Sequence, residues 1–343
     1  MSTLNVGVIG GGFGLKVQAP MINLHPSMKV TAVSTVNRHE LPDDLKNEDV
    51  KPNHYTDWKE MLDTEDLDLV FISSMPVLHF EMAKYALEKG FNVVCEKPFT
   101  VDSSESEQLV ELADRSGQKF LLDFEWRYMR ARQKAKELLN EGRIGNLLHF
   151  EYHMSMAQYQ RLATAKRGWL SQKSKAGGML GALGSHLIDG MRWLTNSEVK
   201  DIAGLLPTHV PEGDGETRDA DDGFLIHGVL ENGSTFSIQF LSGINHGFGS
   251  MMKIFGTEGT IVLEKDEELR FGEANEPLET VQYESVGDVP SELSDVAKRY
   301  YEALYPYLEK VYEYIAEDKL DSDLPTIHDG HENQKVLDRI RKQ

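Results

Sequence analysis

A glycine run placed directly after the first apolar segment constrains the fold of this chain more than any other feature. Leu4–Ile9 is a short apolar run, Gly10–Gly14 reads GGGFG, and helical spacing follows. Glycine permits a tight turn after a strand and lets the backbone approach a pyrophosphate, while the next helix offers free N–H groups. The pattern predicts a dinucleotide-binding strand, loop and helix; the alternative is a glycine-rich turn without a ligand. The loop residues expected to contact the cofactor are Gly10, Gly12, Phe13 and Gly14.

The first third of the chain alternates predicted strands and helices. Leu67–Ser73 and Asn92–Cys95 are strand-like apolar runs, and His79–Lys89 between them has helical spacing. Strands separated by helices predict a parallel, doubly wound sheet. The next predicted helix carries Ser104 and Glu107 at the spacing of a capping box.

Beyond about residue 123 the pattern changes to hairpins. Asn232-Gly233 stands between two apolar runs and is a strong hairpin signal. Consecutive hairpins predict a large, open, mostly antiparallel sheet, so the expected fold class is an α/β Rossmann domain followed by an α+β domain. The acidic segment Pro211–Asp222 is expected to be a mobile loop. The predicted boundaries are 1–123 for the dinucleotide domain, 124–328 for the α+β domain, and 329–343 for a helix returning to the first domain.

Composition argues against several classes of function. The 343 residues carry a formal net charge of -20, and an acidic surface repels phosphate backbones, so we expect no nucleic-acid partner. The single cysteine, Cys95, allows no intrachain disulfide and favours a reducing compartment. No apolar run is long enough to span a membrane, and the first residues do not have the pattern of a signal peptide. We therefore expect a cytoplasmic protein.

The end of the second predicted strand indicates which dinucleotide is preferred. A carboxylate at this point would accept from the ribose 2′-OH of NAD. Here the strand Lys29–Val36 runs through Ser34 and Thr35 to Arg38, with no carboxylate before Glu40. Small hydroxyls followed by an arginine suit a 2′-phosphate. We therefore expect NADP, with Ser34 and Arg38 as contacts; NAD, with Arg38 as a plain surface charge, is the alternative.

A Glu-Lys-Pro turn follows the Asn92–Cys95 strand. It places Lys97 at the carboxyl end of that strand, where ligands bind in open α/β sheets. Pro98 restricts the backbone of the preceding residue and so fixes the lysine at this edge. A lysine held there is suited to contact both a cofactor amide and a substrate hydroxyl.

From this turn outwards, the sequence resembles the glucose–fructose oxidoreductase / inositol dehydrogenase / MocA (Gfo/Idh/MocA) oxidoreductases. The resemblance covers essentially the whole chain. It rests on VGVIGGGFG, DLVFISSMPVLHFEMAKYALEKGFNVVCEKPF, GRIG, GGMLGALGSHLID, IFGTEGT and LPTIHDGHENQKVLD. The second of these motifs is highly specific, and the later ones, weak alone, are strong in this order and spacing.

The resemblance implies NAD(P) in the crevice of the first domain and redox chemistry on a secondary alcohol, usually of a sugar or cyclitol. It implies that Lys97 is the lysine of the family's EKP motif, preceded by Glu96 as a cofactor contact. Ser73, Pro76 and His79 are implied to line the nicotinamide side of the cofactor. It also implies a homodimer or homotetramer formed through the open sheet.

His186 is the second expected catalytic residue. The family pattern Asp-x-Gly-x-His maps its histidine onto His186, and histidine titrates near neutrality, which suits proton exchange with an alcohol oxygen. The aspartate of that pattern falls at Ala182, so this carboxylate is absent. Asp189 lies three residues after His186 on the same helical face, where it either orients the histidine or has a structural role.

The remaining candidates concern the substrate. Arg127 and Tyr128 begin the second domain, where the family often places substrate contacts, and Trp169 either walls a sugar pocket or fills the core. The alternating polar residues of 149–153 favour a polar sheet face over a metal site, so no metal is expected.

These observations predict an NAD(P)-dependent dehydrogenase or reductase that acts on CH–OH groups. Hydride would pass between the nicotinamide and a carbinol or carbonyl carbon, with proton exchange through Lys97, His186 or both. Two alternatives stay open: a non-catalytic dinucleotide-binding sensor with the same fold, and a reductase of a non-sugar substrate.

Overall fold

The computed structural model describes residues 3–38, 40–46 and 51–343. The chain divides into two compact units. The first unit comprises Met1–Tyr128 and Ser285–His331, and the second comprises Met129–Glu284 and Glu332–Gln343. This division differs from the expected boundaries in two ways: the segment after the second sheet returns to the first unit, and residues 332–343, expected to return to the first domain, belong to the second unit. No helix in the described ranges is long and apolar enough to cross a membrane.

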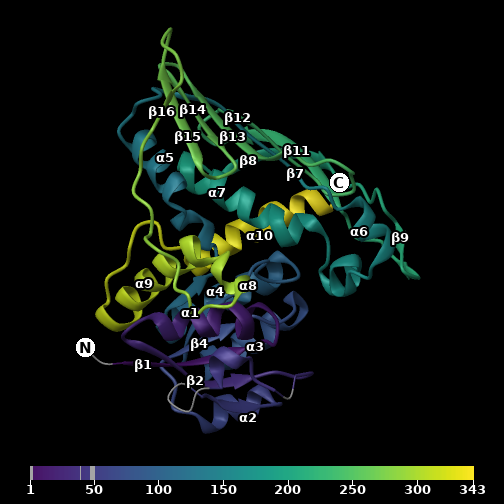
Figure 1. The fold of residues 1–343 in the computed structure, drawn as a ribbon, viewed down its shortest axis with the longest axis vertical. Coiled ribbons are helices and arrows are strands. Elements are labelled where there is room, and N and C mark those ends of the chain that lie inside the picture. Colours follow the sequence, from purple (N-terminus) through teal and green to yellow (C-terminus); the bar gives the residue numbers. More distant parts are fainter. Residues whose placement is uncertain (1–2, 39, 47–50) are drawn as a thin grey trace. The chain divides into compact units, whose positions relative to one another are not determined.

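The first unit is an alternating α/β structure (Figure 1). Its elements are β1 (Leu4–Ile9), η1 (Gly14–Gln18), α1 (Ala19–Leu24), β2 (Met28–Ser34), η2 (Asp43–Leu45), β3 (Asn53–Tyr55), α2 (Trp58–Thr64), β4 (Leu69–Ile72), α3 (Pro76–Glu88), β5 (Asn92–Cys95), α4 (Ser103–Ser116), β6 (Phe120–Leu122), η3 (Glu125–Tyr128), α8 (Asp295–Lys298), α9 (Tyr301–Glu317) and the start of α10 (Ile327–Arg341). The strands form a six-stranded parallel sheet in the order β3-β2-β1-β4-β5-β6. The strand order reverses at β1, which confirms the doubly wound fold. Open α/β sheets bind ligands at the carboxyl ends of the strands beside such a reversal, here β1 and β4.

Two apolar clusters cover the two faces of this sheet. Val6 and Val8 of β1 belong to a cluster with residues of α1 and α9, while Val70 and Ile72 of β4 belong to one with residues of α3 and α4. A parallel sheet needs both faces covered. Helix α9 covers much of one face of the parallel sheet, which is why the segment from residue 285 belongs to the first unit.

The second unit is built around a larger sheet. Its elements are α5 (Arg130–Asn140), β7 (Leu147–Ser155), α6 (Tyr159–Thr164), η4 (Gly168–Ser171), η5 (Lys173–Lys175), η6 (Leu180–Gly184), α7 (Ser185–Thr195), β8 (Val199–Leu205), β9 (Glu212–Gly213), β10 (Glu216–Thr217), β11 (Gly223–Leu230), β12 (Thr235–Leu241), β13 (Gly249–Gly256), β14 (Gly259–Glu264), β15 (Glu268–Glu273) and β16 (Glu279–Thr280). The eight-stranded order is β16-β15-β14-β13-β7-β12-β11-β8. All neighbours pair antiparallel except β7 and β12, so the predicted mostly antiparallel sheet is confirmed.

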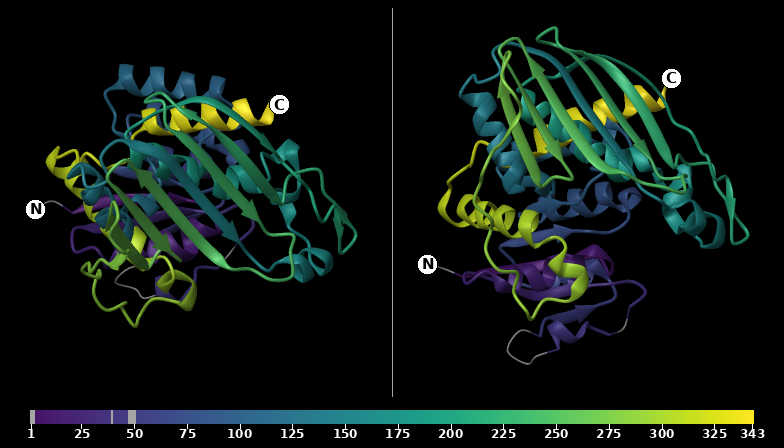
Figure 2. Two further views of the ribbon diagram at one scale, coloured as in Figure 1. Left: turned by 90° about the horizontal axis from the view of Figure 1, so that it is seen from above. Right: turned by 45° about the horizontal axis from the view of Figure 1, so that its top comes forward.

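Strand β7 has one apolar and one polar face, as its alternation predicted. Phe150 and Tyr152 are 1% and 2% exposed. Helices α5 and α7 lie on one face of the sheet, and no helix of the described residues covers the other (Figure 2). The apolar face of β7 is thus covered within the unit and does not itself require a second subunit. Assembly into oligomers stays a prediction.

One predicted helix cap was wrong. Asp102, not Ser104, is the N-cap of α4: its carboxylate accepts from the N–H groups of Ser104 and Glu105 at 2.9 and 3.1 Å. Aspartate and serine are both good N-caps, and the chain reaches helical geometry early enough for Asp102 to take the position.

The segment Pro211–Asp222 is also more ordered than expected. It contains the short hairpin of β9 and β10. Asp221 and Asp222 at its end are buried, and their carboxylates accept backbone N–H groups from other segments of the second unit.

Candidate active site

The glycine loop lies at the carboxyl end of β1, against the end of β4. Gly10 has φ of 141°, and its N–H donates to the carbonyl oxygen of Ser34 at 2.9 Å. A Cβ at Gly10 would lie 2.2 Å from the carbonyl oxygen of Ser73, so only glycine fits. A Cβ at Gly12 would meet no atom within 4 Å, so that side of the loop is open. A loop closed towards the sheet and open on the other side fits the pyrophosphate of a dinucleotide.

Phe13 and Gly14 fix the start of the helix that follows. The ring of Phe13 packs edge-on against Tyr300, with centroids 4.9 Å apart. A Cβ at Gly14 would lie 2.9 Å from Cβ of Ser73 and 3.0 Å from Cγ1 of Val8. Gly14 therefore allows the close helix–strand contact that the third glycine of a dinucleotide loop provides.

Arg38 lies beside this loop. Its Cδ and Nε would be 3.1 and 3.4 Å from a Cβ at Gly11. The hydroxyl of Thr35 donates to the carbonyl oxygen of Arg38 at 2.6 Å, which holds the backbone after β2. Ser34 is buried and Arg38 is exposed. The guanidinium is thus anchored through its backbone and open to an anion.

The Glu-Lys-Pro turn lies at the carboxyl end of β5. Lys97 is half-buried, and its peptide bond to Pro98 is cis. Nδ1 of the fully buried His79 lies 3.2 and 3.1 Å from the carbonyl oxygens of Pro98 and Phe99. Burial lowers the pKa of His79, so the ring is neutral at pH 7. His79 therefore connects the turn to α3, whose first residue is Pro76.

A buried hydrogen-bond network joins the ends of β4, β5 and β6. The hydroxyl of Ser73 donates to Oε1 of Gln18. Nε2 of Gln18 donates both to Oε1 of Glu96, at 3.1 Å, and to Oδ2 of Asp123, at 2.6 Å. The N–H of Lys97 donates to the other carboxyl oxygen of Glu96 at 3.2 Å. The carboxyl of Glu96 therefore points into the unit.

The two carboxyls of this network are electrostatically unusual. Burial, followed by the charge of Asp123, raises the pKa of Glu96 well above its ordinary value. Burial also raises the pKa of Asp123, against opposing hydrogen bonds from Gln18 and Glu96. Gln18 and Asp123 are site residues that the sequence did not lead us to expect. Asp123 directly follows the strand Phe120–Leu122 and could have been placed at this edge by the rule used for Lys97, whereas Gln18 gave no signal.

Arg127 and Tyr128 form contacts within the first unit. Arg127 is 4% exposed and donates to Asp329 at 2.8 Å and to the carbonyl oxygen of Asp323 at 3.2 Å. The hydroxyl of Tyr128 donates to Asp321 at 3.4 Å. Both side chains attach the end of η3 to the segment before α10. Their substrate role stays a prediction.

His186 lies in the first turn of α7 in the second unit and is 3% exposed. The glycine-rich loop before it is held by Asp221, whose carboxylate accepts from the N–H of Leu180 at 2.7 Å. Ala182 lies in η6, between that contact and the histidine. Asp189 is 1% exposed, and its Oδ1 is 4.0 Å from Nη1 of Arg192.

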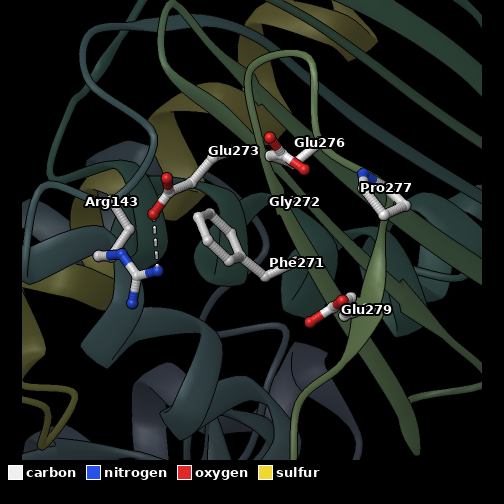
Figure 3. A pocket seen from close by; sticks show the side chains of 7 residues that line it. All are labelled: Arg143, Phe271, Gly272, Glu273, Glu276, Pro277 and Glu279. Atoms are coloured by element: carbon white, nitrogen blue, oxygen red, sulfur yellow. Dashed lines mark hydrogen bonds and ion pairs between the residues drawn. The ribbon is translucent and has the colours of Figure 1, made fainter.

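Trp169 lies in η4 of the same unit and is half-buried. A separate surface hollow of this unit contains none of the predicted site residues (Figure 3). It is lined by Arg143, Phe271, Gly272, Glu273, Glu276, Pro277 and Glu279. Arg143 pairs with Glu273 across it at 3.1 Å. In the described part of the chain no three His, Cys, Asp or Glu residues are grouped to hold a metal ion.

Comparison with known proteins matches both halves of the chain. Residues 4–124 match the oxidoreductase family with an NAD-binding Rossmann fold, and residues 132–262 match the GFO/IDH/MocA C-terminal domain. An uncharacterized oxidoreductase of Synechocystis sp. is 31% identical over 77% of this chain and 72% of its own length. Levoglucosan dehydrogenase of Pseudarthrobacter phenanthrenivorans is 29% identical over 89% of this chain and 84% of its own length.

A solved structure shares the whole fold. Levoglucosan dehydrogenase in complex with NADH and L-sorbose superposes with a TM-score of 0.87 and 25% identity, covering 100% of this chain and 96% of that one. The family resemblance and the predicted fold class are both confirmed. The protein belongs to the Gfo/Idh/MocA oxidoreductases and has the NAD-binding Rossmann domain of that family.

Proposed function

We propose that this protein is an NADP-dependent dehydrogenase that interconverts a secondary alcohol and a ketone on a sugar, sugar derivative or cyclitol. The observation that carries the proposal is the pairing, at one edge of the parallel sheet, of an open glycine cradle with the fixed turn of Lys97. A relative named for levoglucosan, solved with NADH and L-sorbose, supports the sugar-like substrate class.

The residues of the first unit that fit the cofactor are those of the loop and the strand ends. Gly10 and Gly14 allow the loop to lie close to Ser73 at the end of β4, and Gly12 leaves the other side of the loop open for the pyrophosphate. When bound, the nicotinamide supplies the hydride acceptor and donor. Lys97 and His186 are the proposed groups that hold and release the hydroxyl proton.

The cofactor preference has a direct test. Arg38 is exposed beside Gly11, where a 2′-phosphate would form a charge-assisted hydrogen bond, a contact that contributes about 1.5–3 kcal/mol. Fluorescence titration should show NADPH binding roughly 10- to 100-fold more tightly than NADH. Arg38→Asp should remove or reverse that ratio. Lys84→Asp, a charge reversal at an exposed position on α3 of the same unit, should leave it unchanged. Wild-type protein that binds NADH as tightly as NADPH would refute the NADP assignment.

The enzymatic role is tested by turnover set against binding. Sugars, cyclitols and their phosphates are screened with both dinucleotides by following the absorbance of the reduced cofactor. On an active substrate, Lys97→Met and His186→Ala should each lower kcat by about 100- to 10,000-fold, because positioned acid–base groups act on the transition state. Cofactor binding should stay within about tenfold of wild type. If the two residues act on one proton, the double variant should be little worse than the poorer single one.

One observation gives weight to the sensor alternative. Ala182 stands where the family pattern has an aspartate, so one carboxylate expected near His186 is missing. Tight cofactor binding without turnover across the whole screen would favour a dinucleotide sensor over a dehydrogenase. Near-normal turnover in His186→Ala would make that histidine structural and leave the proton to Lys97.

A further inference from the structure

Glu96 and Asp123 are buried carboxyls that share one hydrogen-bond donor. Glu96 is 8% exposed, and Asp123 and Gln18 are fully buried. Because one nitrogen of Gln18 reaches an oxygen of each carboxyl at 3.1 and 2.6 Å, the two acids are close neighbours. Two carboxylates held this close in buried surroundings do not both ionise unless a further positive charge lies beside them, since their like charges oppose each other. One proton is therefore held by the pair.

Two charged neighbours in the described part of the chain act on the pair. Lys97 is the cation whose charge lowers the pKa of both acids, and Glu125 in η3 is an acid whose charge raises the pKa of Glu96. Burial raises the pKa of Cys95 on β5 and of Tyr307 on α9, so both stay neutral. Tyr300, which also lies near Lys97 and Glu96, has a pKa raised by burial. Cys95, Tyr300 and Tyr307 thus stay neutral at neutral pH, so among these acids the pair is the one whose proton a new nearby charge can displace.

The network also reaches the proposed cofactor site. Gln18 ends η1, which begins at Gly14 of the glycine loop. The side-chain oxygen Oε1 of Gln18 accepts from the hydroxyl of Ser73, whose backbone closes that loop from the β4 side. The pair therefore lies under the strand ends where the resemblance places the nicotinamide.

We propose that Glu96 and Asp123 share one proton across Gln18, and that they release it when an oxidised, positively charged nicotinamide is bound and regain it when the ring is neutral. This inference rests on the proposed function, since it needs the dinucleotide at these strand ends. It goes beyond that function by assigning Gln18, Glu96 and Asp123 a role in proton balance. These three are positioning and proton-holding residues, not groups that touch the substrate.

The assignment balances the reaction. When a secondary alcohol is oxidised, its carbinol C–H and O–H bonds break and its C–O single bond becomes a C=O double bond. The substrate thereby gives up a hydride and a proton. The bound dinucleotide is the two-electron acceptor, and its ring loses its positive charge. The Glu96–Asp123 pair, doubly ionised beside the cation, then becomes the stronger base and takes the proton by way of Lys97. Replacement of the reduced cofactor by an oxidised one returns that proton to solvent.

Proton release on cofactor binding, measured without substrate, tests the proposal. Calorimetric titrations in two buffers of different ionisation enthalpy count the protons released with the oxidised and with the reduced dinucleotide. A unit charge nearby shifts a carboxyl pKa by about 1–3 units, so wild type should release up to about one proton more with the oxidised form near neutral pH. Any titration of the 2′-phosphate cancels, because both forms carry it. The difference should vanish at high and at low pH, where both complexes hold the same number of protons.

Matched variants identify the source of the proton. Glu96→Gln leaves a single carboxylate with its donor, so the oxidised-minus-reduced difference should fall close to zero. Glu105→Gln is the control, because burial also raises the pKa of Glu105 but its partner is the N–H of Val101. That control should keep the wild-type difference.

The outcomes distinguish a failure of the shared-proton inference from a failure of the proposed dehydrogenase function. If both forms bind and wild type releases equal numbers of protons with each at every pH, the shared proton is overturned and the dehydrogenase proposal stands. The pH series on wild type decides this point even if Glu96→Gln does not fold. If neither form binds, the proposed function fails, and the proton inference fails with it. A difference that persists unchanged in a folded Glu96→Gln variant also overturns the assignment to this pair.

Discussion

Gly10→Ala is the substitution for which the structure predicts the sharpest penalty. The φ of Gly10 is 141°, a region that non-glycine residues enter at a cost of about 1–3 kcal/mol. The added Cβ would lie 2.2 Å from a backbone oxygen of Ser73, well inside van der Waals contact, and that backbone is held between β1 and β5 neighbours. Forcing such a clash costs a further 1–3 kcal/mol, roughly. We expect a loss of about 2–6 kcal/mol in the free energy of unfolding of the first unit.

The chain offers a matched control in Gly117→Ala. Gly117 is the C-cap of α4 with φ of 70°, and a Cβ there would meet no atom within 4 Å. Only the left-handed backbone cost remains, about 1–2 kcal/mol. Urea unfolding followed by circular dichroism, with dinucleotide titration at low urea, compares the two variants. Gly10→Ala should also lose most cofactor affinity, whereas Gly117→Ala should keep it. Equal destabilisation by the two, within about 0.5 kcal/mol, would refute the close approach of the loop to β4.

Three further outcomes are expected. Arg132→Met should cost about 3–5 kcal/mol in urea unfolding, because it leaves Asp266 without the guanidinium that now lies 2.8 Å away in a largely buried pair; a loss below about 1 kcal/mol would contradict this. Glu96 has a raised folded-state pKa, so its contribution to stability is complete below the unfolded value of about 4.3 and is lost as pH rises towards the folded value. The stability of Glu96→Gln relative to wild type should therefore increase as pH rises from about 4 to 8, and a pH-independent difference would count against it. Light scattering at micromolar concentration should give a dimer or tetramer mass, because Leu205 and Phe248 are 70% and 82% exposed at the large sheet and its ends; a monomer mass would contradict the oligomer prediction.

The parts of the fold that could be predicted are those with local signals. The glycine loop, the parallel strands and the Asn232-Gly233 hairpin each depend on residues adjacent in sequence, and each is present as expected. The cap of α4 was misplaced because Asp102 and Ser104 are both competent N-caps, and only the backbone path decides between them.

The division of the chain was harder to predict because it depends on a contact between distant segments. Tyr307 of α9 donates to the carbonyl oxygen of Leu122 at 2.8 Å, across 185 positions. The N–H of Leu122 in turn donates to the carbonyl oxygen of Pro325. The helical spacing of residues 301–317 indicates an amphipathic helix, but it does not tell which sheet the apolar face covers. A domain boundary placed where the secondary-structure pattern changes therefore misses the return of residues 285–331 to the first unit.

The side chains of the candidate site were likewise predictable only where a local sequence signal places them. Lys97 could be placed from sequence because the strand before it and the proline after it fix its position. Gln18 could not, since its partners Glu96 and Asp123 lie 78 and 105 positions away and no spacing rule connects them. What brings them together is the parallel sheet itself: β4, β5 and β6 are neighbours, so the residues that follow them converge on one edge, opposite the helix that leaves the glycine loop. A polar side chain on the first turns of that helix is therefore within reach of three strand ends at once. In a Rossmann sheet, the residues directly after the strands are best considered as a set: after burial, the next cause of the raised pKa of Glu96 is the charge of Asp123, which follows another strand.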